Sequence, residues 1–199
     1  KHIVYEAWRR VIDLIGATLL GAVSLFLYPF VWFAIKLDDG GPLYVVQERT
    51  GQAQRPLRIL KFRTMTGGVS DAGEAVLQSK KKITKVGKFL RDTRIDELPQ
   101  LWSVIRGKQS LIGPRPELPA LSKLYSEKIP HYGARFIVKP GLSGWAQIHH
   151  ERHPHHGVDI RETQNKLAYD LYYIKNRSFM LDLKIALKTL RILASRSGL

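Results

Sequence analysis

The chain has 199 residues, no cysteine, 44% apolar residues and a formal net charge of +15. Its length allows one well-packed domain with an appendage, and its composition excludes a disordered chain. The lack of cysteine excludes a disulfide framework, a thiolate metal site and a cysteine nucleophile. Residues 1–40 hold four basic and four acidic side chains, so the excess positive charge belongs to the rest of the chain.

The first predicted element is apolar: residues 14–35 read LIGATLLGAVSLFLYPFVWFAI, without a charged side chain. A straight helix of this length would measure ~33 Å, enough for a ~30 Å hydrocarbon core. Basic residues flank both ends, and such residues stay on the cytoplasmic side of a membrane. Because Pro29 interrupts helical hydrogen bonding, we expect a break at Tyr28–Pro29. Two interpretations stay open, a re-entrant helix, which the charges favour, and a proline-kinked span.

A β-hairpin is expected next, from β-prone runs at residues 44–47 and 57–62 separated by TGQAQRP. Residues 66–79 are rich in Gly and polar side chains, which predicts a mobile loop. Basic side chains then surround apolar ones at helical spacing in residues 80–91, which predicts a basic amphipathic helix. Such a helix can be a solvated surface or can lie against anionic lipid headgroups or phosphorylated substrate, and the apolar segment favours the second interpretation.

The candidate catalytic residues are Asp96 and Glu97, in RIDELPQLWSVIRG. Pro99 suits the first turn of a helix, which predicts Asp96 near the N-cap and Glu97 just inside. Unpaired N–H groups at such an end stabilise carboxylates and attract phosphate, although an acidic cap is also a common helix start without function. The surrounding arginines indicate a phosphorylated substrate with a divalent metal; they are Arg91, Arg94, Arg106 and Arg115.

The last third of the chain offers weaker signals. Pro-Gly and Ser-Gly pairs in VKPGLSGWAQI predict turns, and Trp145 suits apolar cover or stacking on a ring. Five of the seven histidines lie within residues 149–156, but Pro154 and the close spacing favour a polar loop near the substrate entrance over a metal site. Helical patterns at residues 162–175 and 180–194 close the chain, and the second also suits a membrane interface.

Several stretches in order resemble a known family: GGPLYVVQERTG, LRILKFRTM, GKFLRDTRIDELPQLWSVIRGKQSLIGPRPE, VKPGLSGWAQI and YDLYYIKNRSFMLDLKIALKTL. With the apolar helix, they resemble the bacterial sugar transferase family, the monotopic phosphoglycosyl transferases, over about residues 8–193. The resemblance implies an α+β, mainly helical, monotopic membrane protein with a small β-hairpin and interfacial amphipathic helices. Residues 1–40 would be a re-entrant membrane helix, and residues 41–199 a cytoplasmic catalytic domain on the membrane surface.

The resemblance also implies an activity: transfer of a sugar 1-phosphate from a UDP-sugar to membrane polyprenyl (undecaprenyl) phosphate, with release of UMP, to initiate polysaccharide or glycoconjugate synthesis. The family's nucleophile falls on Asp96, which would form a phosphosugar-aspartate, and its metal-binding glutamate on Glu97, with Mg²⁺ as cofactor. The expected partners are the UDP-sugar, polyprenyl phosphate and membrane lipid, at the cytoplasmic face of the bacterial inner membrane. A homodimer is compatible with the sequence.

The resemblance extends to substrate-binding positions. Those that line the family's site fall on Lys61, Arg63, Arg91, Arg115 and Pro116. Asp170 matches a recurring acid that would pair with one of these arginines, and the alternative for each residue is a structural salt bridge. Many members carry Asn-Gly-Arg-Asn after GWAQ, where this chain has HHERHPHH, so Arg152 is the candidate replacement for the missing arginine. Many members also have a multispanning N-terminal domain, so the chain is compatible with being the catalytic part of a longer protein.

Two other classes of protein explain part of the sequence. A basic, membrane-associated nucleic-acid-binding protein would account for the charge, but no nucleic-acid motif is visible, so we expect no nucleic-acid partner. A catalytically silent membrane scaffold for polysaccharide assembly is the other class, and the intact Asp96–Glu97 pair argues against it. Binding to random DNA without turnover of UDP-sugars would favour the first class.

Overall fold

The structure is a computed structural model that describes residues 2–66, 82–149 and 159–195. The longer helices are α1 (His2–Leu25), α2 (Tyr28–Asp38), α4 (Lys85–Asp92), α5 (Leu101–Ile105), α6 (Pro119–Lys128), α7 (Trp145–His149), α8 (Ile160–Lys175) and α9 (Phe179–Ala194). Short 3₁₀ helices are η1 (Gln52–Gln54), η2 (Ile95–Gln100) and η3 (Tyr132–Ile137). The strands are β1 (Tyr44–Thr50), β2 (Pro56–Phe62), β3 (Ser110–Ile112) and β4 (Gly141–Ser143).

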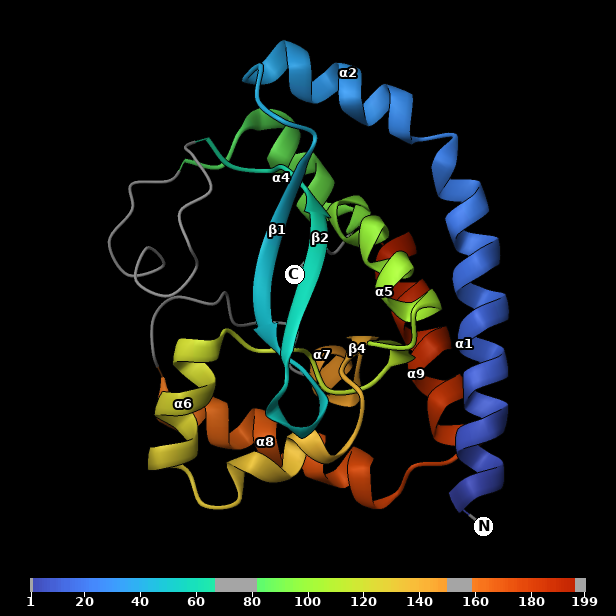
Figure 1. The fold of residues 1–199 in the computed structure, drawn as a ribbon, viewed down its shortest axis with the longest axis vertical. Coiled ribbons are helices and arrows are strands. Elements are labelled where there is room, and N and C mark those ends of the chain that lie inside the picture. Colours follow the sequence, from blue (N-terminus) through green and yellow to red (C-terminus); the bar gives the residue numbers. More distant parts are fainter. Residues whose placement is uncertain (1, 67–81, 150–158, 196–199) are drawn as a thin grey trace.

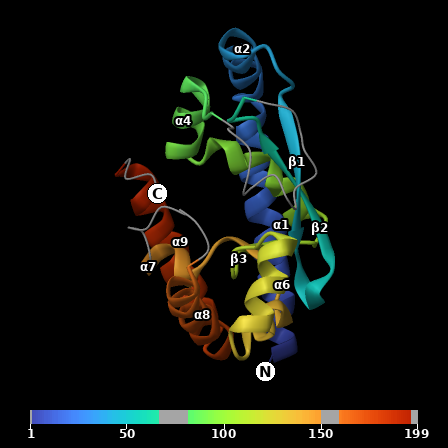
Figure 2. The same ribbon diagram turned by 90° about the vertical axis from the view of Figure 1, so that its left-hand side faces the viewer.

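These elements confirm a mainly helical α+β fold with a small hairpin. In Figure 1, α1 runs along one edge of the molecule and α2 turns across its end. Figure 2 shows the hairpin of β1 and β2 on the opposite side of the molecule from α8 and α9. The central elements η2, α5 and β3 are therefore flanked by the hairpin, α1 and α9.

The N-terminal helix breaks two residues earlier than predicted. α1 ends at Leu25, and the N–H of Leu27 closes a turn onto the Ser24 carbonyl at 2.9 Å. Pro29 lies in the first turn of α2, so the predicted break at Tyr28–Pro29 is wrong in position. The reason is that a proline ring clashes with the carbonyl four residues before it, and the first helical turn tolerates the missing N–H.

The two arms are bent by 55° relative to each other. No single helix in the described part of the chain is both long and apolar enough to cross a membrane. The two arms of the bent pair, taken together, have the length and apolar composition to do so.

Buried polar side chains attach α1 to the centre of the fold. Arg9 donates hydrogen bonds to the Ser110 hydroxyl, at 2.9 Å, and to the Ile112 carbonyl. Asp13 accepts from the same hydroxyl, at 3.0 Å, and from the Leu111 N–H, at 2.9 Å. Because buried polar groups are costly when unpaired, these bonds fix α1 against β3.

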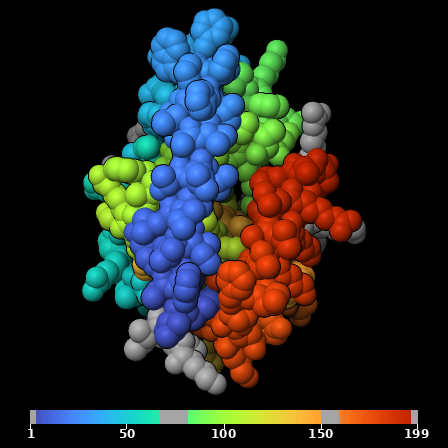
Figure 3. Space-filling model, turned by 90° about the vertical axis from the view of Figure 1, so that its right-hand side faces the viewer, coloured from blue at the N-terminus to red at the C-terminus, as the bar shows by residue number. Residues whose placement is uncertain are grey.

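The outer faces of α1, α2 and α9 are apolar. Figure 3 shows α1 and α9 side by side on one face of the molecule, with α2 continuing beyond α1. Exposed patches of this extent mark protein or membrane interaction surfaces in proteins. The side chains that form this surface, here called the apolar face, include Trp8, Ile15, Leu19, Val23, Phe26, Phe30, Phe33, Leu37, Phe179, Met180, Leu183, Leu187 and Leu190.

The hairpin forms as predicted, in an antiparallel register that sets Val45 opposite Lys61. Alternate residues of a strand share a face, and directly opposed residues of paired strands lie on the same side. Lys61, Gln47 and Arg49 therefore project from one face of the hairpin. Since β2 lies beside η2, this face carries cations to the segment that holds Asp96.

The basic helix is shorter than predicted. α4 begins after Thr84, whose hydroxyl accepts a hydrogen bond from the Gly87 N–H at 2.8 Å and so caps the helix. Ile83 instead pairs with Met65 in an isolated β-bridge, and a residue in such a bridge has extended backbone. Nearly all of the predicted mobile loop lies in residues 67–81, outside the described residues.

The two C-terminal helices are confirmed, each starting one or two residues before its predicted position. Side-chain caps explain both starts: Asp159 accepts from the Glu162 N–H at 3.0 Å, and Ser178 from the Leu181 N–H at 3.3 Å. α8 packs with α6 and η3 around a core that includes Tyr132.

The sequence did not predict β3 and β4, which pair in parallel with Ser110 opposite Gly141. Three-residue strands carry too little periodicity to be recognised from sequence. A Cβ atom at Gly141 would lie 2.1 Å from the backbone nitrogen of Gly113. The glycine in KPG therefore permits two backbones to approach, in addition to forming the predicted turn.

Candidate active site

Asp96 and Glu97 lie in η2, and both are 8% exposed. Asp96 was predicted near an N-cap with Glu97 just inside, and the structure has both in the first turn of this 3₁₀ helix, whose N-cap is Arg94, with a φ of 54° and a carbonyl that accepts from the Glu97 N–H at 3.1 Å. Pro99 lies inside η2, where its missing N–H is tolerated in a short 3₁₀ segment. The two carboxylates are thus held inside the fold and not at an exposed helix end.

Glu97 is bound by two cations. Its Oε1 lies 2.7 Å from Lys61 Nζ and 2.7 Å from Arg115 Nη2. Burial alone would raise the pKa of Glu97, but the charges of Arg115 and Lys61 outweigh burial and hold that pKa well below its ordinary value. Glu97 is therefore ionised at any physiological pH and serves as the shared counter-ion of both cations.

Asp96 has a different environment. No hydrogen-bond donor contacts its carboxylate within the described part of the chain. Burial and the neighbouring charge of Glu97 raise the pKa of Asp96 to about 6, against the opposing effect of Lys61 and Arg115. Two adjacent carboxylates with pKa values pushed apart are typical of sites where they have separate chemical roles. The uncommitted carboxylate is that of Asp96.

Lys61 and Arg91 flank this pair, as the sequence predicted. Burial and the charge of Arg115 lower the pKa of Lys61, while its contact with Glu97 opposes that change. The Arg91 Nε donates to the Thr64 hydroxyl at 3.0 Å, and its charge lowers the pKa of Asp96. Three cations, Lys61, Arg91 and Arg115, therefore act on the two carboxylates.

Arg63, the other cation of KFRTM, is engaged elsewhere. Its Nε lies 2.8 Å from Asp39 Oδ2, at the end of α2, and both side chains are largely buried. This ion pair ties the end of the hairpin to α2. For Arg63 the structure therefore has the structural salt bridge that was predicted as the alternative to substrate binding.

Arg115 lies in the short loop Pro114–Arg115–Pro116, directly after β3. Its side chain is 38% exposed, so a ligand can reach the guanidinium while Glu97 holds it. The flanking prolines restrict the backbone of the loop. The position of the Arg115 carbonyl is fixed from behind by a second arginine.

That second arginine, Arg135 of η3, was missed in the sequence. It donates to the Arg115 carbonyl at 2.9 Å and forms an ion pair with Asp170 at 2.9 Å. Asp170 therefore pairs with none of Lys61, Arg63, Arg91 and Arg115. The resemblance had implied one of these arginines as its partner, so that prediction is wrong. The sequence signal for Arg135 is its position among aromatic residues in HYGARF. A charged side chain in such a segment is expected to have a buried partner.

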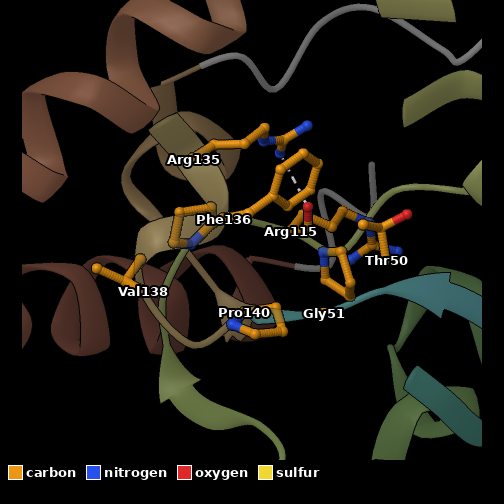
Figure 4. Close-up of a pocket in the computed structure, with 9 residues that line it drawn as sticks. Thr50, Gly51, Arg115, Arg135, Phe136, Val138 and Pro140 are labelled. Carbon is orange, nitrogen blue, oxygen red and sulfur yellow. Dashed lines mark hydrogen bonds between the residues drawn. The ribbon is translucent and has the colours of Figure 1, made fainter. Parts of the chain in front are cut away.

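A small hollow lies beside the Arg115 loop. Figure 4 shows Arg135 and Phe136 on one side of it and Thr50 and Gly51 on another, with the hydrogen bond between Arg135 and Arg115 as a dashed line. Pro116, a predicted substrate-binding residue, lines this hollow together with Pro114, Val138 and Pro140. The hollow adjoins the backbone of Arg115, and its contents would influence the loop that carries the guanidinium.

Trp145 is part of an aromatic stack. Its ring stacks on Tyr172 with centroids 5.5 Å apart, and the Lys184 ammonium lies 5.3 Å from its centroid. His149 continues the stack, onto Tyr169 at 5.5 Å. Arg152 and the remaining histidines of the cluster lie outside the described residues.

The site offers a divalent metal two carboxylate ligands and no larger cluster of ligating side chains among the described residues. Within residues 2–66, 82–149 and 159–195, no group of three or more His, Cys, Asp or Glu side chains gathers to hold an ion. Asp96 and Glu97 nevertheless suit Mg²⁺, which binds through one or two carboxylates together with waters and substrate phosphates. Glu97 Oε2 has a single contact, at 3.5 Å from Arg115, and so retains room for such a ligand.

An uncommitted buried carboxylate among fixed cations is suited to covalent chemistry on an anionic substrate. Comparison with known proteins gives this arrangement a family. The model of the bacterial sugar transferase family matches residues 4–196. The chain therefore belongs to the bacterial sugar transferase family, and the resemblance in its motifs is confirmed.

Relatives in three bacteria cover nearly all of the chain. UDP-N-acetylgalactosamine-undecaprenyl-phosphate N-acetylgalactosaminephosphotransferase of Aeromonas hydrophila is 39% identical over 198 residues, which is 98% of this chain and 45% of that protein. UDP-glucose:undecaprenyl-phosphate glucose-1-phosphate transferase of Caulobacter vibrioides is 40% identical, over 94% of this chain and 70% of that protein. An uncharacterized sugar transferase of Bacillus subtilis is 37% identical, over 96% and 89%. The chain thus spans less than half of the first relative and most of the other two.

Proposed function

We propose that the protein transfers a sugar 1-phosphate from a UDP-sugar to a membrane polyprenyl phosphate. The observation that carries this proposal is the division of roles in the dyad: Glu97 is held by Lys61 and Arg115, while none of the described residues donates a hydrogen bond to the neighbouring Asp96 carboxylate. The names of the relatives support the substrate classes, because both named transferases act between a UDP-sugar and undecaprenyl phosphate.

In the first proposed step, a carboxylate oxygen of Asp96 attacks the phosphorus that carries the sugar. A phosphorus–oxygen bond to the aspartate forms, and the bond to UMP breaks with its electron pair leaving on UMP. Arg115 and Lys61 lie beside the reacting carboxylate, where their charges would offset the charge that develops on the phosphate oxygens. A phosphosugar-aspartate remains on the enzyme.

In the second step, a phosphate oxygen of the polyprenyl phosphate attacks the same phosphorus. The bond to Asp96 breaks, the carboxylate is regenerated, and a polyprenyl diphosphate sugar is the product. A covalent intermediate suits two substrates that arrive from different phases, because one nucleophile serves the aqueous donor and the lipid acceptor in turn.

Mg²⁺ is proposed as the cofactor. Glu97 and Asp96 would hold it together with the diphosphate, and when bound it supplies charge neutralisation for the leaving nucleotide. Removal of divalent cations by a chelator should abolish activity. Activity that persists would show that Lys61 and Arg115 alone neutralise the charge of the leaving nucleotide.

The apolar face is proposed to lie in the membrane, with α1 and α2 forming a re-entrant helix. Its support is the exposure of large apolar side chains on α1, α2 and α9 together with the 55° bend. Placement at the cytoplasmic face of the bacterial inner membrane, a role in initiating polysaccharide synthesis and a homodimer stay predictions.

The proposed function is tested with the purified protein in detergent, undecaprenyl phosphate, Mg²⁺ and a panel of UDP-sugars. Release of UMP that requires both substrates supports transfer to lipid. Incubation with donor alone, followed by intact-mass analysis, should reveal a protein heavier by one phosphosugar, and Asp96→Asn should lack this adduct. No UMP release from any UDP-sugar, or an unchanged adduct in Asp96→Asn, would overturn the proposal.

A further inference from the structure

Arg49 of β1 is a partly buried cation with incomplete partners. Its Nη2 donates to Gln47 Oε1 at 3.0 Å, and its Nη1 reaches the Pro116 carbonyl only at 3.4 Å. Its Nε is buried and has no hydrogen-bond acceptor among the described residues. No carboxylate in residues 2–66, 82–149 or 159–195 lies within ion-pair distance of Arg49. Guanidinium groups withdrawn from water are ordinarily paired and hydrogen-bonded, so Arg49 retains capacity to bind a further anion.

The surroundings of Arg49 indicate where that anion would lie. Arg49 projects from the same face of the hairpin as Lys61, which contacts Glu97. Its contact with Pro116 places it against the loop that carries Arg115. Burial and the charge of Arg115 lower the pKa of Arg49, and the nearby charges of Glu117 and Glu97 oppose that change without forming an ion pair with it.

The distance from the dyad matters for what can bind. A strand advances about 3.3 Å per residue, so Arg49 lies roughly 13 Å along β1 from Val45, the residue opposite Lys61. The long side chain of Arg49 nevertheless brings its charge within reach of Arg115 and Glu97, so a donor with two phosphates offers one phosphate to the dyad and one to Arg49. An acceptor lipid, whose phosphate is its single charged group, is the other source of a phosphate.

We propose that Arg49 binds a substrate phosphate together with Arg115. A guanidinium offers parallel N–H donors that match two phosphate oxygens, and Arg49 has an unused Nε and a weakly engaged Nη1 on either side of the Nη2 that donates to Gln47. The assignment rests on the proposed function, since it supplies the phosphorylated substrates. It adds to that function a residue that none of the predicted site positions includes.

A structural role for Arg49 makes the opposite prediction. If its task were to hold the Pro116 carbonyl, Arg49→Gln would lower the melting temperature and leave ligand binding in the folded protein unchanged. If it binds phosphate, removal of an unpaired, partly buried cation beside Arg115 leaves the ligand-free protein equally stable or more stable. Stability and binding therefore change in different directions under the two roles.

The test compares Arg49→Gln and Arg49→Lys with a matched control, Arg58→Gln. Arg58 lies on the same hairpin, but its side chain is 77% exposed and pairs with Glu48 at 3.2 Å. We expect Arg49→Gln to weaken binding of one phosphate ligand at least tenfold without a fall in melting temperature, Arg49→Lys to lose less, and Arg58→Gln to stay within twofold of wild type. These changes are measured by calorimetric titration with UMP and by KM values for the UDP-sugar and for undecaprenyl phosphate.

The two sources of phosphate give different results. A weaker UMP affinity with a raised KM for the UDP-sugar assigns Arg49 to the nucleotide, and a raised KM for undecaprenyl phosphate alone assigns it to the lipid. Unchanged values for both overturn the inference, as does a lower melting temperature with normal binding. If wild type binds UMP but transfers no sugar phosphate, the proposed function fails while the binding comparison still decides the role of Arg49; a wild type that binds neither ligand overturns both.

Discussion

Replacing Asp96 with Asn is expected to abolish transfer and also to stabilise the folded protein near neutral pH. Asn keeps the shape of the side chain but has no negative charge and is a poor nucleophile, so the adduct cannot form. The stability effect follows from the surroundings of Asp96, which lies in a buried position beside the ionised Glu97. The wild-type protein must hold a charge there that its environment disfavours.

The size of the effect follows from the pKa of Asp96, which burial first, and then Glu97, raise from 3.8 to about 6. Since each pH unit corresponds to ~1.36 kcal/mol, the ionised carboxylate costs about 3 kcal/mol of folding free energy. The sign is fixed by the raised value: the folded state binds a proton more tightly than the unfolded state. The cost is therefore absent below about pH 4, grows between pH 4 and 6, and is complete at pH 7.5.

The assay is thermal unfolding of both proteins in the same detergent at several pH values from 4 to 7.5. A free-energy gain of this size raises the melting temperature by several degrees for a chain of this length. The difference between Asp96→Asn and wild type should be largest at pH 7.5 and vanish toward pH 4. Glu97→Gln is the matched control, and it should be less stable than wild type by about 3–5 kcal/mol, because it leaves Lys61 and Arg115 without their shared partner.

A lower melting temperature for Asp96→Asn at pH 7.5 would refute this reasoning. A gain that does not depend on pH would refute it as well, since the stabilisation would then have a cause other than the charge. Equal effects of Asp96→Asn and Glu97→Gln would show that the two carboxylates share one environment.

Three further outcomes are expected. The value of kcat/KM for UMP release should rise with pH through about 6, because Asp96 must lose its proton to attack; a rate at pH 5 equal to that at pH 8 contradicts this. Asp170→Asn should raise KM for the UDP-sugar, because it removes the 2.9 Å ion pair of Arg135 and leaves that arginine with a 3.9 Å contact to Glu117 and its hydrogen bonds to the Tyr132 hydroxyl and the Arg115 carbonyl; unchanged steady-state kinetics would limit Asp170 to structure. Pro29→Ala restores an N–H and removes the clash that ends α1, so single-cysteine labelling in this cysteine-free chain should place the two helix ends on opposite sides of the membrane; labelling of both ends from the cytoplasm would show that the proline does not set the topology.

Patterns within a single element were readable from the sequence. The hairpin and the two C-terminal helices show regular alternation or helical periodicity over many residues, and the structure has them at nearly the predicted bounds. The dyad was found because Asp96 and Glu97 are adjacent in sequence and accompanied by arginines. Lys61, some 35 residues away, was assigned by resemblance, and its contact with Glu97 arises from the hairpin lying beside η2.

Features that depend on tertiary packing were not readable. The partner of Asp170 is Arg135, in a segment without a motif, and the pairing depends on α8 lying against η3. The short strands β3 and β4 form only because their backbones meet at glycines distant in sequence. Even the helix break was displaced, since the clash caused by Pro29 acts on a carbonyl four residues earlier and not at the proline itself.

Because Arg9 and Asp13 form hydrogen bonds to β3, α1 cannot be removed or replaced by another helix without disturbing the centre of the fold. β3 is followed after Gly113 by the Arg115 loop, so the helix that would enter the lipid also supports the strand before the arginine that contacts Glu97. A chain shortened to begin after α2 would leave the Ser110 hydroxyl and the Leu111 N–H without their partners. A water-soluble form should therefore be sought by replacing the exposed apolar side chains of α1 with polar ones while Arg9 and Asp13 are kept.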